Sequence, residues 1–442
     1  MIGIVASLTS CERFLDLKPN KALAVPNKLQ DLQALLDDNS VINSSGVSAG
    51  EVSSDDYYLT ESTWAGITQE VDRRMYIWEK DYVFLASAND WFRSYQIIYS
   101  ANIVLDNLAE IEATSSNQQA WNNIKGQALF IRAKQFFQNV LVWSKIYDSS
   151  TAKEDLGIPL RVSQDFNVPS VRPSVDATYR QVIKDLRDAM GLLPDKPLAK
   201  TRASLPAAYG LLGRVYLAMG EYDSCFHFTD LALKMENKLL DYNTEIDPDT
   251  AQPFQQFNDE VIVEGYMRRP TALYPNNAKV DSVLYGMYKP GDVRTLAFFR
   301  DNQDGTYGFK GNYSVGLFDG IAVDELYLMR AECNARLGEV RAALDDLNTL
   351  LRHRFEYESF TPVDVSDSND LLQLILDERR KELLFRGIRW MDIKRYNRDG
   401  AGIELVRNIG DIQYKLPAKS NRFALPIPEL VIERSGMQQN RY

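Results

Sequence analysis

The stretch "DERRKELLFRGIRWMDIKRY" (377–396) decides how the C-terminal part of this chain folds. Continued at a helical period, it places four charged side chains on one face, at spacings of four, four and three residues: Glu378, Glu382, Arg386 and Arg389. Opposite charges at such spacings stabilise an exposed helix by about 0.2–0.5 kcal/mol per pair. The neighbouring apolar run 383–385 also fits a partly buried ion network that ties the last helix to the core. Neither interpretation is catalytic.

Helical periodicity extends over much of the remaining chain. "WFRSYQIIYSANIVLDNLAEI" (91–111) and "WNNIKGQALFIRAKQFFQNVLVWSKIY" (121–147) repeat apolar residues at intervals of three and four, which is typical of one buried helix face. "SVDATYRQVIKDLRDAMGLLP" (174–194) opens with Ser174, a residue type that caps helix N-termini, and stops before Pro194. The sequence therefore predicts a mainly helical protein.

Two segments have the spacing of tetratricopeptide repeats, which are pairs of helices of about 34 residues. "YGLLGRVYLAMGEYDSCFHFTDLAL" (209–233) is the clearer copy, and "YLMRAECNARLGEVRAALDDLNTLL" (327–351) is looser. Cys225 occupies a position where such repeats usually carry alanine, so we expect a small buried residue there. The two copies are far apart, which argues against a continuous repeat array.

The intervening regions are rich in turn-forming residues. Segments near 40–90 and 235–320 are dense in Pro, Gly, Asn and Asp, a composition that indicates long irregular loops. Long loops in a compact protein usually carry function. No linker divides the chain, so we predict one domain over 11–442: a tetratricopeptide-like scaffold of helical pairs with these two insertions as its working surface.

Composition excludes several classes. The chain has 442 residues, 45% of them hydrophobic, and a net charge of −11 without a basic tract, which argues against a nucleic-acid partner. No apolar run reaches the roughly 18–20 residues that span a bilayer. Three cysteines, at 11, 225 and 333, are too few and too scattered for a disulfide framework or a zinc site, and we predict no metal and no cofactor.

The N-terminus carries a different signal. "LTSC" (8–11) follows the short apolar segment "MIGIVAS" and precedes the charged "ERFLDLKPN". Leucine, two small residues and cysteine resemble the bacterial lipobox, in which the cysteine is lipidated and becomes the first residue of the mature protein. Residues 1–10 are then the remnant of a signal peptide, and Cys11 is the lipid anchor. The alternative is a soluble protein with an unmodified cysteine near its start.

The 377–396 stretch resembles the C-terminal signature of the SusD/RagB family of outer-membrane glycan-binding lipoproteins. It matches the family pattern at ten positions: Glu378, Arg379, Arg380, Glu382, Leu383, Phe385, Gly387, Arg389, Trp390 and Asp392. It departs from the pattern at Arg386, usually Glu, and at Ile388, usually His. Further segments match in the family order: "CERFLDLKP", "ANIVLDNL", "GQALFIRAKQFF", "LYGMYKPGDVR", "DELYLMRAECNARLG" and "LPIPELVIERSGMQQNRY".

This resemblance implies a function. Members of the family are lipid-anchored on the outer face of the outer membrane and cap a SusC-like TonB-dependent transporter. They bind oligosaccharides or polysaccharides without catalysis and deliver them to the channel. The implied binding surface consists of aromatic platforms in irregular loops on the helical scaffold.

Saccharides stack their C–H faces on exposed rings and bond their hydroxyls to nearby polar groups. Aromatic residues in the predicted helices and family motifs are expected in the core: Trp91, Trp121, Trp143, Trp390, Tyr209, Tyr216 and Tyr288. The loops supply the candidates, of which Trp64 and Tyr274 come first, followed by Tyr57, Tyr58 and Trp78. Arg269, Asn276 and Asn277 are the expected hydroxyl partners. For each ring the alternative is packing onto the helices.

Two other classes compete with a glycan-binding lipoprotein. A glycoside hydrolase needs two carboxylates across a cleft, which 61 acidic residues always supply somewhere, but no catalytic motif supports it. A soluble peptide-binding tetratricopeptide adaptor accounts for the repeats but not for the long aromatic loops. "DNQDGTYGFKG" (301–311) suggests a calcium loop, but it lacks the spacing of an EF-hand, and we predict a hairpin turn at Asp304-Gly305 instead.

Overall fold

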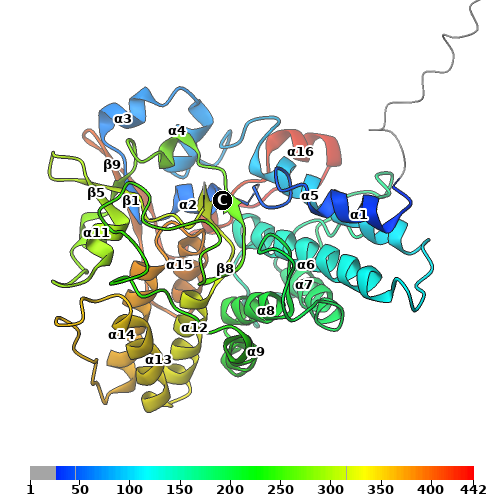
Figure 1. Cartoon of the computed structure of the whole chain (residues 1–442). Helices are drawn as coiled ribbons and strands as arrows, with labels where there is room; N and C mark the ends of the chain where they lie inside the picture. Colours follow the sequence, from blue (N-terminus) through cyan, green and yellow to red (C-terminus); the bar gives the residue numbers. More distant parts are fainter. Residues whose placement is uncertain (1–25, 45, 315) are drawn as a thin grey trace, which may run out of the picture.

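A computed structural model describes residues 26–44, 46–314 and 316–442 (Figure 1). The predicted signal remnant 1–10 and the predicted lipidation site Cys11 lie outside these residues. The structure is mainly helical, with 46% of residues in helices and only short strands, as the sequence predicts. Among the described residues, no helix is both long and apolar enough to cross a membrane.

The longer helices form two groups in Figure 1. The N-terminal group lies at the right: α1 (Leu29–Leu36), α5 (Asp90–Leu108), α6 (Gln118–Trp143), α7 (Val175–Met190), α8 (Leu205–Met219) and α9 (Tyr222–Met235). The C-terminal group lies at the lower left: α12 (Val323–Arg336), α13 (Val340–Arg352), α14 (Ser368–Glu382) and α15 (Arg389–Arg398). The shorter helices are α2 (Ala49–Ser53), α3 (Glu61–Gly66), α4 (Glu70–Tyr76), α10 (Ser282–Tyr285), α11 (Arg294–Phe298) and α16 (Glu429–Ser435).

Local sequence signals set the ends of several helices. The hydroxyl of Ser174 accepts a hydrogen bond from the backbone N–H of Ala177 at the start of α7, which confirms the predicted cap. Ser204 caps α8 in the same way, and Gly220 ends that helix in the left-handed region at φ 81°.

Both predicted helical pairs are present. α8 packs on α9, α12 packs on α13, and α9 also packs on α12, so the two pairs form one scaffold although their sequences are far apart. At Gly213 a Cβ atom would lie 2.5 Å from Thr229 Oγ1, so the close approach of α8 to α9 depends on a residue without a side chain. Cys225 is fully buried, as expected for a small residue at that position.

Within the described part of the chain, the strands form five antiparallel pairs, two of which are hairpins. One hairpin consists of β9 (Leu405–Ile409) and β10 (Ile412–Leu416), and the other of β5 (Phe299–Asp301) and β6 (Tyr307–Phe309). The turn of the β5–β6 hairpin contains Gly305 at φ 79°, which confirms the predicted turn. The remaining strands are β1 (Tyr57–Tyr58), β2 (Val261–Val263), β3 (Tyr266–Met267), β4 (Lys279–Val280), β7 (Leu317–Phe318) and β8 (Ile321–Ala322).

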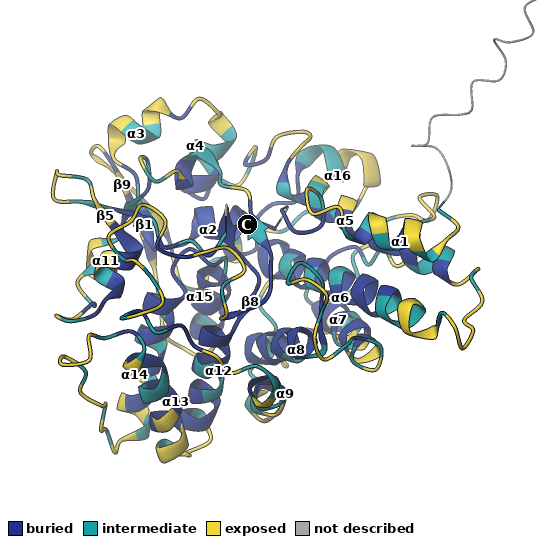
Figure 2. Ribbon diagram, viewed as in Figure 1, coloured by how far each residue is buried: buried dark blue, intermediate teal, exposed yellow. Residues whose placement is uncertain are grey.

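One strand pair joins the two predicted insertions. β1 pairs with β4, with Tyr57 opposite Val280 and Tyr58 opposite Lys279. β2 pairs with β8 and β3 with β7, which closes the base of the second insertion. Figure 2 shows the two regions differ in burial: the scaffold helices α6, α8, α12 and α15 are largely buried, whereas α3 and the loops near α11 carry many exposed residues.

The 377–396 stretch is not one continuous helix, so the prediction of a shared charged face is wrong. α14 ends at Glu382 and α15 begins at Arg389. Between them the chain turns through Phe385 at φ 57° and Gly387 at φ 71°. The physical reason is that the two arginines have partners elsewhere in the fold: Arg386 donates to the buried Asp324 (2.5 Å), and Arg389 to the partly buried Asp55 (2.7 Å).

The alternative prediction, a buried ion network, is confirmed. Glu378 and Glu382 both accept hydrogen bonds from Arg294, whose side chain has no exposed surface. The same network continues through Arg354, which donates to Glu382 and Glu260, and a second part joins Arg395 to Glu332. It therefore ties α14 and α15 to residues 28 to 88 positions away in the sequence.

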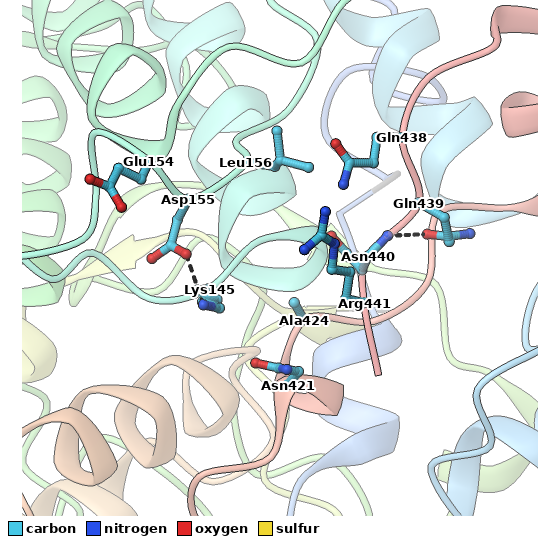
Figure 3. A pocket seen from close by; sticks show the side chains of 10 residues that line it. All are labelled: Lys145, Glu154, Asp155, Leu156, Asn421, Ala424, Gln438, Gln439, Asn440 and Arg441. Carbon is cyan, nitrogen blue, oxygen red and sulfur yellow. Dashed lines mark hydrogen bonds and ion pairs between the residues drawn. The ribbon is translucent and has the colours of Figure 1, made fainter.

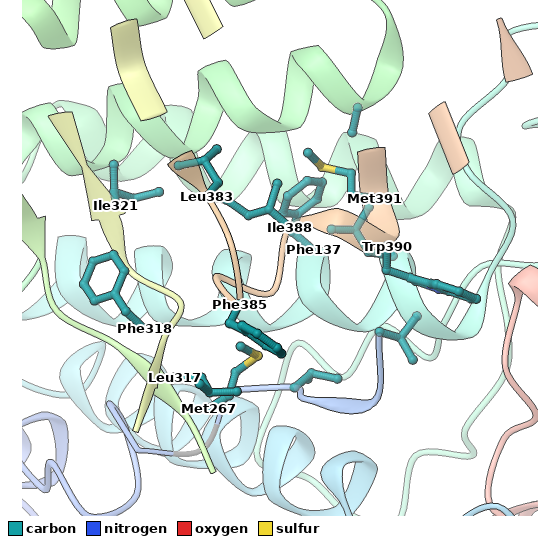
Figure 4. Packing of buried hydrophobic residues seen from close by; sticks show 14 of the residues in the cluster. Phe137, Met267, Leu317, Phe318, Ile321, Leu383, Phe385, Ile388, Trp390 and Met391 are labelled. Atoms are coloured by element: carbon teal, nitrogen blue, oxygen red, sulfur yellow. The ribbon is translucent and has the colours of Figure 1, made fainter. Parts of the chain in front are cut away.

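The turn between α14 and α15 also supports both insertions. Figure 4 shows Phe385 beside Met267 and Leu317 in the hydrophobic core. The Phe385 ring centroid lies 6.1 Å from that of Tyr57 in the first insertion and 5.0 Å from that of Phe309 in the second. The family-signature segment thus fixes the position of the loops on the scaffold.

Candidate functional site

The second insertion encloses a cleft of about 490 Å³. Three segments form it: the loop after α9, the chain around the short helix η3 (Thr271–Leu273), and the β5–β6 hairpin with the residues that follow it. The lining residues are Asp249, Thr250, Ala251, Gln252, Phe254, Gln256, Arg269, Pro275, Arg300, Phe309, Lys310, Asn312 and Ser314. All of them lie within the region 235–320 that the sequence predicts to be functional.

The lining combines apolar rings with polar side chains. Phe254 and Phe309 are at least nine-tenths buried and contribute the apolar part. Amide and charged groups such as Gln252, Gln256 and Arg300 provide donors and acceptors around them. This mixture is what small-molecule sites use: apolar surface for contact area and a few polar groups for orientation.

Arg269 is the most informative polar residue of the cleft. Its side chain is half-buried, and its Nε atom has no hydrogen-bond partner among the described residues. With the Asn312 amide oriented so that its nitrogen donates to Gly316 O (3.3 Å), the Asn312 oxygen accepts from Arg269 Nη2 at 2.9 Å. Burial lowers the pKa of the Arg269 guanidinium below its ordinary value. A buried donor without a partner is costly, so this N–H favours a ligand that carries an acceptor.

The walls of the cleft are held by hydrogen bonds that two of its basic side chains, Arg300 and Lys310, donate. Arg300 Nη2 donates to Pro275 O (3.1 Å) and to Asn276 Oδ1 (3.0 Å), which fixes the 274–277 loop against the β5–β6 hairpin. Lys310 Nζ donates to Pro248 O and Thr250 O, both at 2.8 Å, on the opposite side. Because Arg300 and Lys310 already have these partners, their role is to hold the walls of the cleft in position.

Of the predicted site residues in the loop 269–277, only Arg269 is among the lining residues of this cleft. Arg269 lines it, and Tyr274, 49% exposed, precedes the lining residue Pro275. Asn276 is bonded to Arg300, and Asn277 Nδ2 donates to Thr271 O (2.7 Å) within its own loop. Asn277 therefore stabilises the loop conformation.

Two other predicted platforms are wrong. Tyr57 and Trp78 are each 1% exposed, so neither ring presents a face to a ligand. Both polar groups have partners inside the protein: Tyr57 donates to Val52 O (2.8 Å) and Trp78 Nε1 to Ser53 O (2.9 Å). Both rings also pack on the Arg407 guanidinium. At both positions, hydrogen bonds inside the protein and packing on Arg407 stabilise the buried ring more than exposure to solvent would.

Trp64 and Tyr58 lie outside the lining of the cleft. Trp64 is half-buried on α3, and its Nε1 donates to Arg73 O of α4 (3.1 Å). Tyr58 is half-buried in β1, opposite Lys279. Helix α4 contacts η3, so the first insertion touches the 269–277 loop although it adds no lining residue.

The sequence prediction missed several polar residues of the cleft. Gln252, Gln256, Arg300 and Asn312 line it but were not among the candidates. The available signal was the turn-rich composition of "AQPFQQFNDE" (251–260) and "DNQDGTYGFKGN" (301–312), in which amide side chains are frequent. A search guided by aromatic rings alone does not select them.

Comparisons with known proteins place the chain in a class. A family model described as "Starch-binding associating with outer membrane" matches residues 13–217, and one described as "SusD family" matches residues 324–442. SusD-like protein P2 of Formosa agariphila is 23% identical over 79% of this chain and 79% of its own length.

Solved structures have the same fold. A SusD superfamily protein from Bacteroides thetaiotaomicron has a TM-score of 0.74 and 23% identity, over 94% of this chain and 100% of its own. A SusD-like carbohydrate binding protein from Bacteroides vulgatus has a TM-score of 0.69 and 20% identity, over 93% and 97%. A laminarin binding SusD-like protein has a TM-score of 0.63 and 21% identity, over 92% and 97%.

The chain belongs to the SusD/RagB family of carbohydrate-binding proteins. The resemblance carried by the 377–396 stretch is thereby confirmed. Proteins of this family bind glycans without catalysis and are associated with the outer membrane, so the glycoside hydrolase alternative is set aside.

Proposed function

We propose that this protein binds oligosaccharides in the cleft of the second insertion. The observation that carries the proposal is Arg269, a half-buried residue of the cleft lining, which has no hydrogen-bond partner among the described residues for its buried Nε atom. A sugar hydroxyl or ring oxygen is a suitable acceptor for it. The exposed ring of Tyr274, at the adjacent turn, provides a stacking surface beside this donor.

The proposal extends to delivery and anchoring. The protein is attached to the outer membrane at the cell surface by a lipid on Cys11 and passes its ligand to a SusC-like TonB-dependent transporter. The "LTSC" segment at 8–11 supports the anchor, and the family model for outer-membrane association supports the location. Trp64 and Tyr58 remain candidates for an outer contact of a longer ligand, because both are half-buried and not fully enclosed.

A glycan array tests the binding step. The wild-type chain is compared with Tyr274→Ala, with Arg269→Gln and with Phe166→Ala, whose ring is 80% exposed on the α6–α7 connection away from the cleft lining. We expect Arg269→Gln to weaken binding about tenfold or more, because hydrogen bonds to charged groups contribute about 1.5–3 kcal/mol. Tyr274→Ala should also weaken it, and Phe166→Ala should not. Equal binding by all four proteins would contradict the proposed site.

Metabolic labelling tests the anchor. Cells that express the wild-type chain should incorporate radiolabelled palmitate into it, and cells that express Cys11→Ser should not. Both chains are expressed behind a complete lipoprotein signal. Label that persists in Cys11→Ser would place the lipid elsewhere, and an unlabelled wild type would exclude a lipid anchor and favour the soluble alternative.

A further inference from the structure

A second cleft lies near the C-terminal end of the chain, in two adjoining hollows of about 470 and 270 Å³. The hollows share four lining residues: Lys145, Asp155, Asn421 and Ala424. Figure 3 shows the larger hollow, where the loop after α6 faces the 438–441 segment. None of these residues belongs to the cleft of the second insertion.

The smaller hollow is basic, in contrast to the acidic chain as a whole. Its charged lining residues are Lys145, Lys394, Arg398 and Lys419 against Asp148 and Asp155. The complete chain carries a net charge of −11. A local basic surplus in an otherwise acidic protein attracts anions to this one region.

Most of these charges already have partners. Lys145 forms an ion pair with Asp155 at 2.8 Å, and Arg398 bonds Asp399 and two backbone carbonyls. Asp148 accepts hydrogen bonds from Ser150, which hold the pKa of its carboxyl below the ordinary value.

Lys394 is different. Its side chain is only 4% exposed, and its Nζ donates to two backbone carbonyls, Leu141 O and Ser144 O, each at 2.6 Å. No carboxylate of the described residues pairs with it, and burial lowers the pKa of its amine from 10.5 to about 7. A buried ammonium group without a counter-ion is costly, and an anion in the adjoining hollow would supply that counter-ion.

The other lining groups suit a sugar that carries the anion. Phe423, Ile146 and Ala424 provide apolar surface, and Thr151, Ser420 and Asn421 provide hydroxyl and amide groups. We propose that this hollow binds the oxyanion of an acidic saccharide, a carboxylate or a sulfate, between Lys394 and Lys419. Anion binding follows from the cleft alone, whereas the saccharide as its carrier rests on the proposed function.

This arrangement links binding to protonation. The charged groups that line the hollow with Lys394 are Lys145, Arg398, Lys419, Asp148 and Asp155. A bound oxyanion stabilises the ammonium form of Lys394 and raises the pKa of its amine. With that pKa near 7, most of the free protein lacks this proton at pH 8 and must take it up on binding, so affinity falls as the pH rises from 6 to 8.

Isothermal titration calorimetry on the full chain tests the proposal. The ligands are digalacturonate, galactose 6-sulfate, neutral galactobiose and sodium acetate, in buffers of different ionisation enthalpy. We expect one or both acidic sugars to bind more tightly than galactobiose and acetate, with proton uptake at pH 8 and little at pH 6. The two acidic sugars distinguish carboxylate from sulfate. Equal affinity for acidic and neutral sugars, equal affinity for acetate, or no proton uptake at pH 8 would overturn the proposal.

Three variants localise the effect. Lys419→Gln, an exposed substitution that leaves the fold intact, should weaken acidic-sugar binding about two- to fivefold, the range of one exposed charge. Lys394→Met should abolish the proton uptake, and its circular dichroism reports whether it folds; if it does not, Lys419→Gln carries the test. The control is Lys153→Gln, an exposed lysine on the α6–α7 connection, which supplies Lys145 and Asp155 to the hollow but has Lys153 itself outside the lining. Unchanged binding in Lys419→Gln would contradict the site.

The two proposals fail independently. The proposed function predicts that neutral oligosaccharide binding depends on Tyr274 and not on Lys419. The anion site predicts that acidic-sugar binding depends on Lys419 and not on Tyr274.

Discussion

Arg294 and Glu382, 88 positions apart in the sequence, meet in the interior with Nη1 2.7 Å from Oε2, and neither side chain has exposed surface. The other oxygen of Glu382 accepts from Arg354 Nε at 2.8 Å, so one carboxylate bridges two guanidinium groups. Burial alone would raise the pKa of this carboxyl, but Arg354 and Arg294 outweigh burial and hold the pKa below its ordinary value. The end of α14 is therefore held by a buried ion network in which the loss of one charge leaves the others without a partner.

Removing one member of this network should be strongly destabilising. We expect Arg294→Met to lower the free energy of unfolding by about 3–5 kcal/mol, because it leaves buried carboxylates without a partner. Urea denaturation measures the effect. The control is Arg341→Gln, which removes an exposed i,i+4 pair with Asp345 and should cost no more than about 0.5 kcal/mol. Similar losses in the two variants would contradict the assigned role of the network.

Glu51 should make stability depend on pH in the neutral range. It is 1% exposed and accepts from the Gly387 N–H, and burial together with the nearby Asp56 raises the pKa of its carboxyl from 4.5 to about 8. The folded protein keeps a proton that the unfolded chain releases near pH 4.5, so this contribution is complete below pH 4.5 and lost as the pH approaches 8.

The variant Glu51→Gln stays neutral at every pH. Its melting temperature relative to the wild type should therefore rise between pH 5 and pH 8. Thermal unfolding at the two values measures the difference. A difference that stays constant would show that Glu51 ionises at the same pH in the folded and unfolded states.

Gly387 should not tolerate a side chain. Its φ of 71° disfavours alanine by roughly 1–2 kcal/mol, and a Cβ atom there would lie 2.9 Å from Met267 Sδ. We expect Gly387→Ala to cost about 2–4 kcal/mol, since crowding adds to the backbone strain. Gly400→Ala is the control, because its φ is also positive but no atom lies within 4 Å of the added Cβ. Chemical denaturation of both variants separates crowding from strain, and equal losses would exclude crowding.

The burial of Trp78 and the exposure of Tyr274 predict a large loss of stability when Trp78 is truncated and almost none when Tyr274 is. Trp78→Ala should cost about 3–5 kcal/mol, because it empties a fully enclosed site. Tyr274→Ala should change stability by no more than about 0.5 kcal/mol. Denaturation curves for both variants measure this contrast. A large loss in Tyr274→Ala would show that its ring packs in the core, and the proposed stacking surface would then be wrong.

The helical scaffold was predictable because its determinants are local. Serine caps and apolar residues at intervals of three and four act within a few turns of one helix, and Gly213 acts between α8 and α9, two helices that follow each other in the sequence. The hairpin at Gly305 was predictable for the same reason, since the turn residues are adjacent in the sequence. The region 235–320 that holds the cleft was also indicated by composition.

Features that depend on distant partners were not predictable. The break between α14 and α15 arises because Arg386 and Arg389 bind Asp324 and Asp55, residues that no local pattern connects to them. Likewise, nothing around Tyr57 signals that the ring is enclosed by Arg407 and Phe385 from the far end of the chain. Loop aromatics look alike in the sequence, whether their surroundings cover them or not.

The pairing of β1 with β4 has a consequence for engineering the ligand preference of this protein. A recipient that receives the 235–320 loop of a relative without its 40–90 loop would lose the backbone hydrogen bonds between Tyr57–Tyr58 and Lys279–Val280. It would also lose the fit of both loops around Phe385. The 40–90 and 235–320 loops must therefore be exchanged together. Chimaeras that receive both loops from one relative should fold, whereas chimaeras that receive only one should not.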